Sequence, residues 1–378
     1  RITAQLIRAS DQSHLWSETF DRGFDEDVFA IQDEIARAIV TALQVQLGGR
    51  AAPSIAAQRG TDDLEAYNAY LLGRFQWTRR TRDGVLGSIA SFRRAIRLDP
   101  GYARAYTGVA DAYAIAGNFG WMAPREAFPQ AREAVDRALA LNPELAEAHA
   151  SLGAILSWYE WDFEGADRAF KRAIALNPEN AFARYWYSLL LDYTNRREEA
   201  RTQIEAALQL DPLALQIRNG RGNRHQWYGD SESAIREYRA ILDLDPDFQN
   251  ARRWLGVAYL EAGQVREGLA VLDSVPEAFA GDIESLRGWG LAQMGRTDEA
   301  RVALRGILSR GASSLPYAVR GYGVLGEPDE AFRILRGALD ARLYPLLQMV
   351  LTPASDPLRS DPRFNELLKD IGLLKYWQ

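Results

Sequence analysis

The fold class can be inferred from the stretch AHASLGAILSWYEWDFEGADRAFKRAIALNP, residues 148–178. Its second half places the small Ala166 and the large Phe170 on one helical face, and it ends in Leu-Asn-Pro at 176–178. Proline just after an apolar-periodic run ends a helix, and the preceding Asn suits a turn. Its first half is also helical and is centred on Gly153. Glycine inside a helix costs about 1 kcal/mol relative to alanine, so we expect a neighbouring helix to pack closely there.

The ending of this stretch recurs at a nearly constant interval. The motif Leu-(Asp/Asn)-Pro stands at 98–100, 141–143, 176–178, 210–212 and 244–246. Successive prolines are therefore 43, 35, 34 and 34 residues apart. A second helical pattern lies half a period earlier, so the chain reads as tandem helix pairs. We expect each pair to bury its apolar side only against the pair before it and the pair after it.

Composition excludes several classes of protein. The 378 residues are 47% hydrophobic and 25% charged, which is typical of a soluble chain that forms a core. The net charge of −6 argues against nucleic-acid binding and against docking on an anionic membrane. The chain has no cysteine, which excludes disulfides and thiolate metal sites and leaves the compartment unknown. No apolar run reaches about 18 residues, so no membrane insertion is expected.

The segments outside the regular repeats have their own patterns. Residues 1–48 read as a β-hairpin, RITAQLI and HLWSETF, followed by a helix with an apolar stripe from Asp27. A linker rich in glycine and alanine spans 49–61, and about eight helix pairs fill 62–343. Residues 344–378 are expected to form capping helices over the last pair. The chain has neither an initiator Met nor a signal peptide, so we expect a fragment or a processed form.

The 34-residue helix pair with its small and large residues resembles the tetratricopeptide repeat (TPR). Residues 1–40, 148–178 and DPLRSDPRFNELLKDIGL at 356–373 together resemble the C-terminal half of large bacterial signalling proteins. These proteins join an adenylate cyclase, Ser/Thr kinase or winged-helix effector to a TolB-like α/β segment and then to TPRs. The resemblance implies an all-α solenoid, a right-handed superhelix of helix-turn-helix repeats, preceded by a partial TolB-like β-hairpin and helix. It also implies a scaffold that binds peptides or proteins.

The stretch RNGRGNRHQWYG, residues 218–229, has a composition that suggests a phosphate-binding loop, because phosphates favour basic residues and G-x-G spacing. In the repeat register, however, Gly222 falls where Gly256 falls one unit later. A phosphate-binding glycine loop also needs a preceding strand, and none is predicted here. The stretch is therefore expected to form the first helix of the fifth repeat.

The same register selects candidate partner-binding residues. By the resemblance, the first helices line the concave face of the solenoid. Asn219 and Asn223 match positions that point into the groove of peptide-binding relatives, and so do Asn250 and Arg253 one unit later. The alternative is that the arginines of this stretch pair with acidic residues of adjacent helices. Arg221 occupies a slot that is apolar in the next repeat, so it needs an acidic partner if it is buried.

Aromatic residues form a second candidate surface in the third and fourth units. They are Trp158, Tyr159, Trp161, Phe163, Tyr185, Trp186 and Tyr187. Aromatic side chains are enriched at interface hot spots, which favours Trp158 and Tyr185 as contacts for a partner. The alternative is that these rings interlock in the core between repeats.

No pattern for catalysis, metal binding or cofactor binding is evident. The histidines, His14, His149 and His225, fall in separate units without metal-ligand spacing. Nucleophile-elbow, Walker, kinase and H-E-x-x-H motifs are absent from the sequence. We therefore expect no catalytic residue, no metal, no cofactor and no enzymatic activity in this chain.

Two functions remain open. The first is a protein-interaction scaffold whose concave face holds a peptide or protein partner, as part of a bacterial signalling or regulatory protein. The second is a self-assembling structural protein. In that case the N-terminal hairpin takes strands from another copy and the apolar end LLKYWQ, residues 373–378, docks on the next subunit. Contacts of this kind produce homo-oligomers, filaments or tubes.

Overall fold

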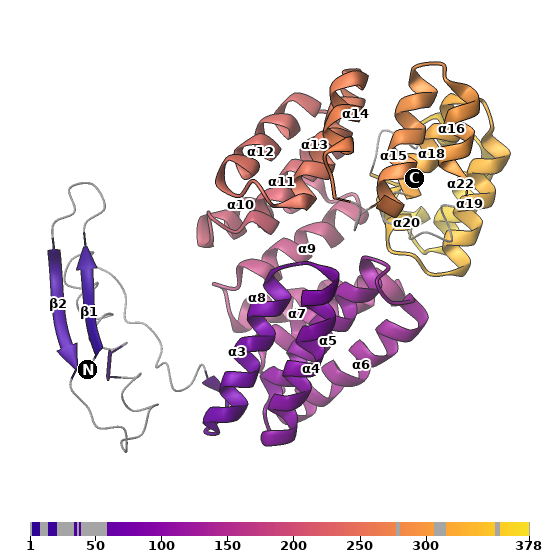
Figure 1. Cartoon of the computed structure of the whole chain (residues 1–378). Coiled ribbons are helices and arrows are strands. Elements are labelled where there is room, and N and C mark those ends of the chain that lie inside the picture. The colour runs from indigo at the N-terminus through magenta and orange to yellow at the C-terminus, as the bar shows by residue number, and fades with distance from the viewer. Residues whose placement is uncertain are drawn as a thin grey trace.

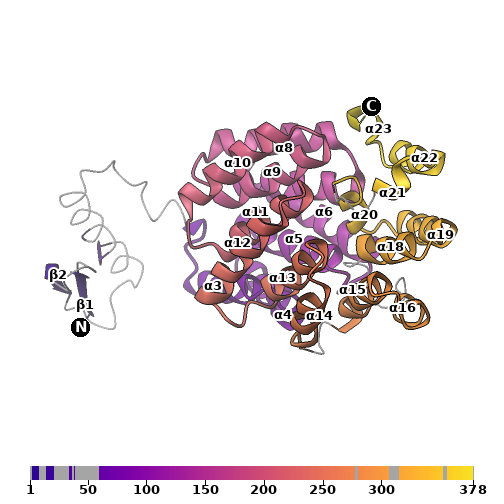
Figure 2. The ribbon, with the colours of Figure 1, turned by 90° about the horizontal axis from the view of Figure 1, so that it is seen from above.

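The computed structural model describes residues 2–7, 14–20, 34–35, 38, 59–276, 280–305, 315–351 and 356–377. Within these ranges the chain after residue 58 consists of helices joined by turns and short loops (Figure 1). Consecutive helices form pairs, and Figure 2 shows that the pairs follow a curved path. The first helices α5, α11 and α13 lie toward the middle of that view, and the second helices α10, α14 and α19 lie toward its rim.

The bounds of the elements follow the repeat closely. The pairs in the described ranges are α3 (Leu64–Thr78) with α4 (Arg82–Leu98), α5 (Ala103–Asn118) with α6 (Pro124–Leu141), α7 (Ala146–Ile155) with α8 (Phe163–Leu176), α9 (Ala181–Tyr193) with α10 (Arg197–Leu210), α11 (Leu215–Trp227) with α12 (Ser231–Leu244), α13 (Gln249–Glu261) with α14 (Val265–Asp273), α15 (Ala280–Gln293) with α16 (Thr297–Leu304), and α18 (Leu315–Val324) with α19 (Pro328–Asp340). A π-helical turn, η1 (Leu156–Glu160), extends α7. The short helices α20 (Pro345–Gln348), α21 (Asp356–Arg359), α22 (Pro362–Asp370) and α23 (Leu374–Trp377) follow.

Central glycines allow the two helices of a pair to pack closely. A Cβ added to Gly153 of α7 would lie 2.9 Å from the ring of Phe170 on α8. One at Gly222 of α11 would lie 2.6 Å from the ring of Tyr238 on α12. Phe170 and Tyr238 are fully buried. The close approach expected from the sequence is therefore confirmed, and its cause is a large ring on the second helix seated on the glycine of the first.

The Leu-Asx-Pro motif ends the second helix of each of the first five pairs and shapes the next turn. The side-chain oxygen of Asn177 accepts a hydrogen bond of 3.1 Å from the backbone N–H of Glu179. Asp245 does the same for the N–H of Asp247, at 3.0 Å. Such Asx turns compete with helical hydrogen bonding. The residue before the proline therefore stops the helix and directs the chain into the next pair.

The C-terminal segment makes a contact that the repeat does not predict. The hydroxyls of Tyr193 and Tyr344 are hydrogen-bonded to each other, although the two residues are 151 positions apart. The indole N–H of Trp377 donates to the carbonyl of Tyr193 at 2.8 Å. Arg125 donates to the carbonyl of Asp340 at 2.6 Å. We call these interactions of residues 340–377 with the second, third and fourth pairs the closing contact.

The expectation that each pair touches only its neighbours is therefore wrong at the C-terminus. It is also wrong within the stack, where Trp77 of α3 meets Phe182 of α9 with 5.9 Å between ring centres. The curvature of the array brings the last pair and the short helices that follow it against α6, η1, α8 and α9. The same segment also packs on the last pair, where Arg336 of α19 forms an ion pair with Asp370 at 2.5 Å. Residues 356–377 thus bridge two distant parts of the chain.

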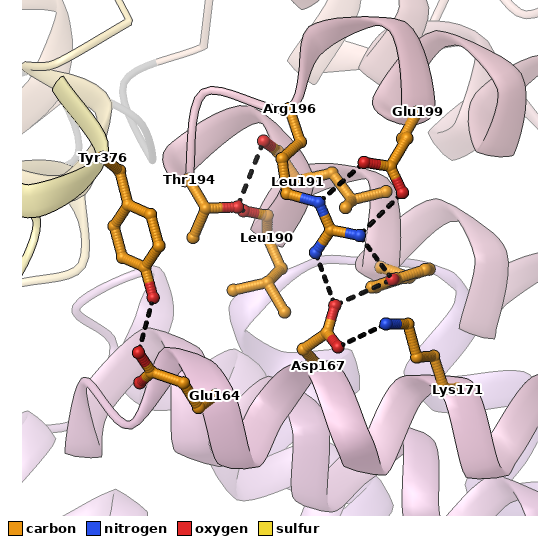
Figure 3. Close-up of polar contacts among 10 residues, drawn as sticks. Glu164, Asp167, Lys171, Leu190, Leu191, Thr194, Arg196, Glu199 and Tyr376 are labelled. Carbon is orange, nitrogen blue, oxygen red and sulfur yellow. Dashed lines mark hydrogen bonds and ion pairs between the residues drawn. The ribbon is translucent and has the colours of Figure 1, made fainter.

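Polar contacts accompany both kinds of packing (Figure 3). Between the third and fourth pairs, Asp167 of α8 forms an ion pair with Arg196 at 2.6 Å, and within α8 it forms another with Lys171 at 2.7 Å. In the closing contact, the hydroxyl of Tyr376 donates to Glu164 at 2.9 Å. Helix α8 therefore contributes to the stack and to the closing contact at once.

The N-terminal strands pair as the sequence predicts. Strands β1 (Ile2–Ile7) and β2 (His14–Phe20) are antiparallel, with Ile2 opposite Phe20. The turn between them and most of the helix expected from Asp27 lie outside the described residues. Glu34, Ile35 and Ala38 belong to that expected helix and are helical.

Candidate functional site

The first helices of the middle pairs line one cavity on the inner side of the array. Its volume is about 90 Å³, and it is open to solvent on one side. All six residues that the sequence selected line it, from η1, α9, α11 and α13: Trp158, Tyr185, Asn219, Asn223, Asn250 and Arg253. The loop after α3, the end of α5 and α20 complete the wall. The curvature therefore brings together residues that were selected in separate repeats.

The lining of this cavity is polar, aromatic and positively charged. It contains Arg80 and Arg253, side-chain amides from α5, α11, α13 and α20, and the aromatic rings around Trp158. Among the described residues that line it, none is Asp or Glu. A cavity with fixed cations and no carboxylate attracts anionic or acceptor-rich groups.

Asn219 and Asn223 reach the cavity from α11. Asn219 is 3% exposed, and its Oδ1 has no hydrogen-bond partner in the described part of the chain. The Oδ1 of Asn223 accepts a hydrogen bond of 2.7 Å from the hydroxyl of Tyr238. A Cβ at Gly220 would lie 2.3 Å from the ring of Tyr185. Gly220 thus permits the close approach of Tyr185 to α11.

Asn250 and Arg253 lie one unit further along, on α13. Arg253 is 7% exposed, and its guanidinium lies 4.6 Å from the centre of the Trp254 ring. It donates a long hydrogen bond, 3.5 Å, to Oδ1 of Asn250. The aromatic ring and the amide hold the cation at the cavity wall.

The aromatic cluster serves mainly as packing. Trp158 is 2% exposed and meets the rings of Trp186 and Tyr344 edge-on, at 5.5 and 5.6 Å between centres. Tyr159 stacks on Phe128 at 4.7 Å. The core-packing interpretation is therefore confirmed for these rings. Trp158 also lines the cavity, and its indole N–H has no partner among the described residues.

The arginines of α11 pair with acidic residues of nearby helices, as the alternative interpretation expected. Arg218 and Arg221 bind the two carboxylate oxygens of Glu237 at 2.9 and 2.8 Å. Arg224 forms an ion pair of 2.7 Å with Asp192, and these side chains are 5% and 0% exposed. Residues 218–227 are helical, as predicted, so the stretch is not a phosphate loop.

Arg80 is a cavity residue that the sequence analysis missed. It follows α3 with φ +50°, at the position that Gly229 occupies after α11 with φ +82°. Its guanidinium lies 3.6 Å from the centre of the Trp77 ring, and burial lowers its pKa to about 10. An arginine at a turn position that favours glycine is a signal that sequence reading could have used.

A buried carboxylate lies near the cavity. Asp111 of α5 accepts a hydrogen bond of 2.5 Å from Ser151 of α7. Burial raises the pKa of Asp111 to about 6, although the hydrogen bond from Ser151 opposes that change. Asp111 lines a neighbouring hollow that shares Trp186 with the first one. The inner side of the array therefore carries a positive hollow beside one that contains a carboxylate.

The described ranges offer neither a metal-binding cluster nor a membrane-spanning helix. These ranges contain no group of three or more His, Cys, Asp or Glu side chains that could hold a metal ion. The helices that the structure describes include none with both the length and the hydropathy needed to cross a bilayer.

This geometry defines an α-solenoid repeat protein with an inner cavity. Tetratricopeptide repeat family models match residues 158–212 and 228–288. These two stretches are thus similar to tetratricopeptide repeats, and the predicted all-α solenoid of helix-turn-helix repeats is confirmed.

Part of the chain is related in sequence to an adenylate cyclase-like protein. It is 36% identical over 109 residues to "Putative adenylate cyclase 3" of Rhizobium meliloti (strain 1021). The match covers 29% of this chain and 18% of that protein. Because the shared part is so small, the relative's name does not transfer an activity to this chain.

Solved structures share the fold. The APC/C hetero-tetramer Cut9–Hcn1 matches with a TM-score of 0.56 and 14% identity, over 90% of this chain and 59% of that chain. The human IFIT1 dimer with PPP-AAAA matches with a TM-score of 0.54 and 16% identity, over 82% of this chain and 80% of that chain. At these identities the likeness concerns the fold alone.

Proposed function

We propose that this chain is a non-catalytic interaction scaffold that binds a peptide segment of a partner protein in the inner cavity, as part of a bacterial signalling or regulatory protein. Residues 62–343 form the array of about eight repeats in this proposal, and residues 344–378 cap it. Residues 1–48 are a partial TolB-like segment, joined by a linker at 49–61. TPR repeats and their fold support the scaffold role.

The observation that carries the proposal is the convergence of the six selected residues in one cavity. Asn219, Asn223 and Asn250 present amides, which both donate and accept hydrogen bonds, as a peptide backbone requires. The buried Oδ1 of Asn219 has no partner in the described part of the chain. Buried polar atoms normally have a partner, so a peptide N–H is a suitable donor to this oxygen.

The test is a selection followed by affinity measurements. Phage displaying random 12-residue peptides are selected on the immobilised full chain, and the synthetic peptides are measured by fluorescence anisotropy. Loss of one buried hydrogen bond should weaken binding about tenfold in Asn219→Ala and in Asn250→Ala. Asn365→Ala is the matched control, since Asn365 is an exposed amide on α22. If no peptide is selected, or if both cavity variants bind as the wild type does, the proposal fails.

Self-association is the second candidate, and the N-terminal strands favour it. The sheet of β1 and β2 has two strands in the described ranges, and an isolated two-stranded hairpin is marginal in water. Residues 374–377, in contrast, pack on their own chain, so this candidate relies on the hairpin alone. Light scattering of the chain with and without residues 1–47 tests it. A mass that does not change with dilution and equals one copy excludes it.

A further inference from the structure

Arg80 is a half-buried cation at the wall of the cavity, and its Nη1 atom is fully buried. Its Nη1 has no hydrogen-bond partner in the described part of the chain. Burial lowers the pKa of Arg80, and the charge of Asp111 partly opposes that change. The carboxylate of Asp111 is itself hydrogen-bonded by Ser151. The charge of Arg80 is therefore only partly compensated within the fold.

The backbone at Arg80 differs from that of the glycines at the same turn position after α11 and α13. Its φ of +50° lies in the left-handed region, where residues with a Cβ are strained. Gly229 and Gly263 occupy this turn position in later pairs without that strain. The arginine at this turn stacks on Trp77 and lines the cavity. Both the strain and the desolvation of the guanidinium cost free energy, and a bound anion would offset the desolvation.

Other unpaired groups line the same cavity. The indole N–H of Trp158 and the Oδ1 of Asn219 lack partners in the described ranges, and both side chains are almost fully buried. Arg253 contributes a second buried cation from α13. Arg80 and Trp158 can each donate a hydrogen bond to an acceptor on a ligand, and Asn219 can accept one from a ligand N–H. A peptide that carries an anionic side chain supplies both.

We propose that the cavity selects peptides by an anionic oxygen group, a carboxylate or a phosphate on a side chain, which accepts hydrogen bonds from Arg80. The backbone N–H of that peptide donates to Asn219. This inference rests on the proposed function and adds the charge of the ligand to it. It also assigns a role to Arg80 in the turn after α3. Peptide binding by the asparagines and Arg253 of the later repeats alone would not require that arginine.

The first experiment needs no protein variant. The probe is the 12-residue peptide selected as described above, synthesised with each acidic residue replaced in turn by its amide and with one acidic residue replaced by phosphoserine. One amide replacement should weaken binding about 10- to 100-fold, because a hydrogen bond to a charged group is lost. The phosphoserine peptide should bind at least as well as the amide peptide. If every amide peptide binds as tightly as the parent, the inference is overturned while peptide binding itself stands.

The second experiment assigns the effect to Arg80. Arg80→Gln should remove most of the difference between the acidic and amide peptides, and Arg80→Lys should keep part of it. Arg266→Gln, which changes an exposed arginine on α14, is the matched control and should leave the difference unchanged. If the full difference persists in Arg80→Gln, the inference is overturned. If Arg80→Gln does not fold, the peptide series on the wild type decides.

A third measurement separates the two proposals. If no peptide is selected, the proposed function fails, and inorganic phosphate becomes the probe at constant ionic strength. Phosphate should raise the unfolding temperature of the wild type more than that of Arg80→Gln, since an anion that binds the folded state stabilises it. Equal shifts in the two proteins overturn the anion site as well.

Discussion

One ion pair of the stack and one of the closing contact differ strongly in their exposure to solvent. Within the stack, Arg224 and Asp192 are 5% and 0% exposed. In the closing contact, Lys375 and Glu164 are 57% and 54% exposed. Water and salt screen the exposed pair but hardly affect the buried one. The closing contact also joins residues up to 215 positions apart, which adds loop-closure entropy to its cost. The stack should therefore hold while the closing contact opens.

The largest effect is expected inside the stack. Arg224→Ala leaves the carboxylate of Asp192 buried without the cation that lies 2.7 Å from it. Breaking one partner of a buried pair costs about 3–5 kcal/mol of the free energy of unfolding, which urea unfolding measures. The control is Arg201→Ala, whose exposed pair with Glu198 is worth about 0.2–1 kcal/mol. Equal losses in the two variants would show that burial does not separate these pairs.

A buried carboxylate in the stack should make stability depend on pH. The pKa of folded Asp111 is raised from 3.8 to about 6 by burial, so the folded chain holds this proton more tightly than the unfolded chain does. The contribution of this group to stability therefore falls as pH rises from about 4 to about 6, and the loss persists at pH 7. Asp111→Asn should be about 1–3 kcal/mol more stable than the wild type at pH 7 and similar to it below about pH 4.

The difference between Asp111→Asn and the wild type is measured by thermal unfolding across this pH range. Asp243→Asn, at an exposed position on α12, is the control and should show no such trend. A stability difference that does not change between pH 4 and pH 7 would contradict the raised pKa of Asp111.

Much of the stack could be predicted because its contacts follow the period. Tyr228 donates to Asp192 across 36 positions and Gln226 donates to Glu261 across 35 positions, about one repeat in each case. Asn219, which the register selected, lines the inner cavity. A sequence pattern with a constant repeat length therefore predicts which first helices are neighbours and which of their residues lie on the inner face.

The closing contact and Arg80 could not be found in this way. Whether Tyr344 reaches Tyr193, or Arg80 reaches the cavity of α11 and α13, depends on the curvature of the whole array. That curvature is the sum of small rotations between successive pairs. No single sequence motif predicts the total rotation. The apolar residues at 373–378 led us to expect that this end docks on another subunit. The partners that its Tyr376 and Trp377 find, Glu164 and Tyr193, lie in its own chain.

A moderate effect is expected in the closing contact. Trp377→Ala removes a hydrogen bond of 2.8 Å to the carbonyl of Tyr193 and the contacts of the ring with the guanidinium groups of Arg197 and Arg359. We expect a loss of about 1–2 kcal/mol. Amide hydrogen exchange should become faster in α20–α23 and stay unchanged in α5–α8. Faster exchange throughout the stack would show that the two regions unfold together.

The smallest effect is expected for the exposed ion pair of the closing contact. Lys375→Ala removes the ion pair of Lys375 with Glu164, while Glu164 keeps its hydrogen bond of 2.9 Å from Tyr376. Lys375 and Tyr376 lower the pKa of Glu164, but both charged side chains are more than half exposed. Their coupling in a double-mutant cycle with Glu164→Ala should therefore be about 0.5 kcal/mol and should decrease in 1 M salt. A coupling well above 1 kcal/mol that persists in salt would mean that charge holds the closing contact, and the contrast with the buried pair of the stack would then be lost.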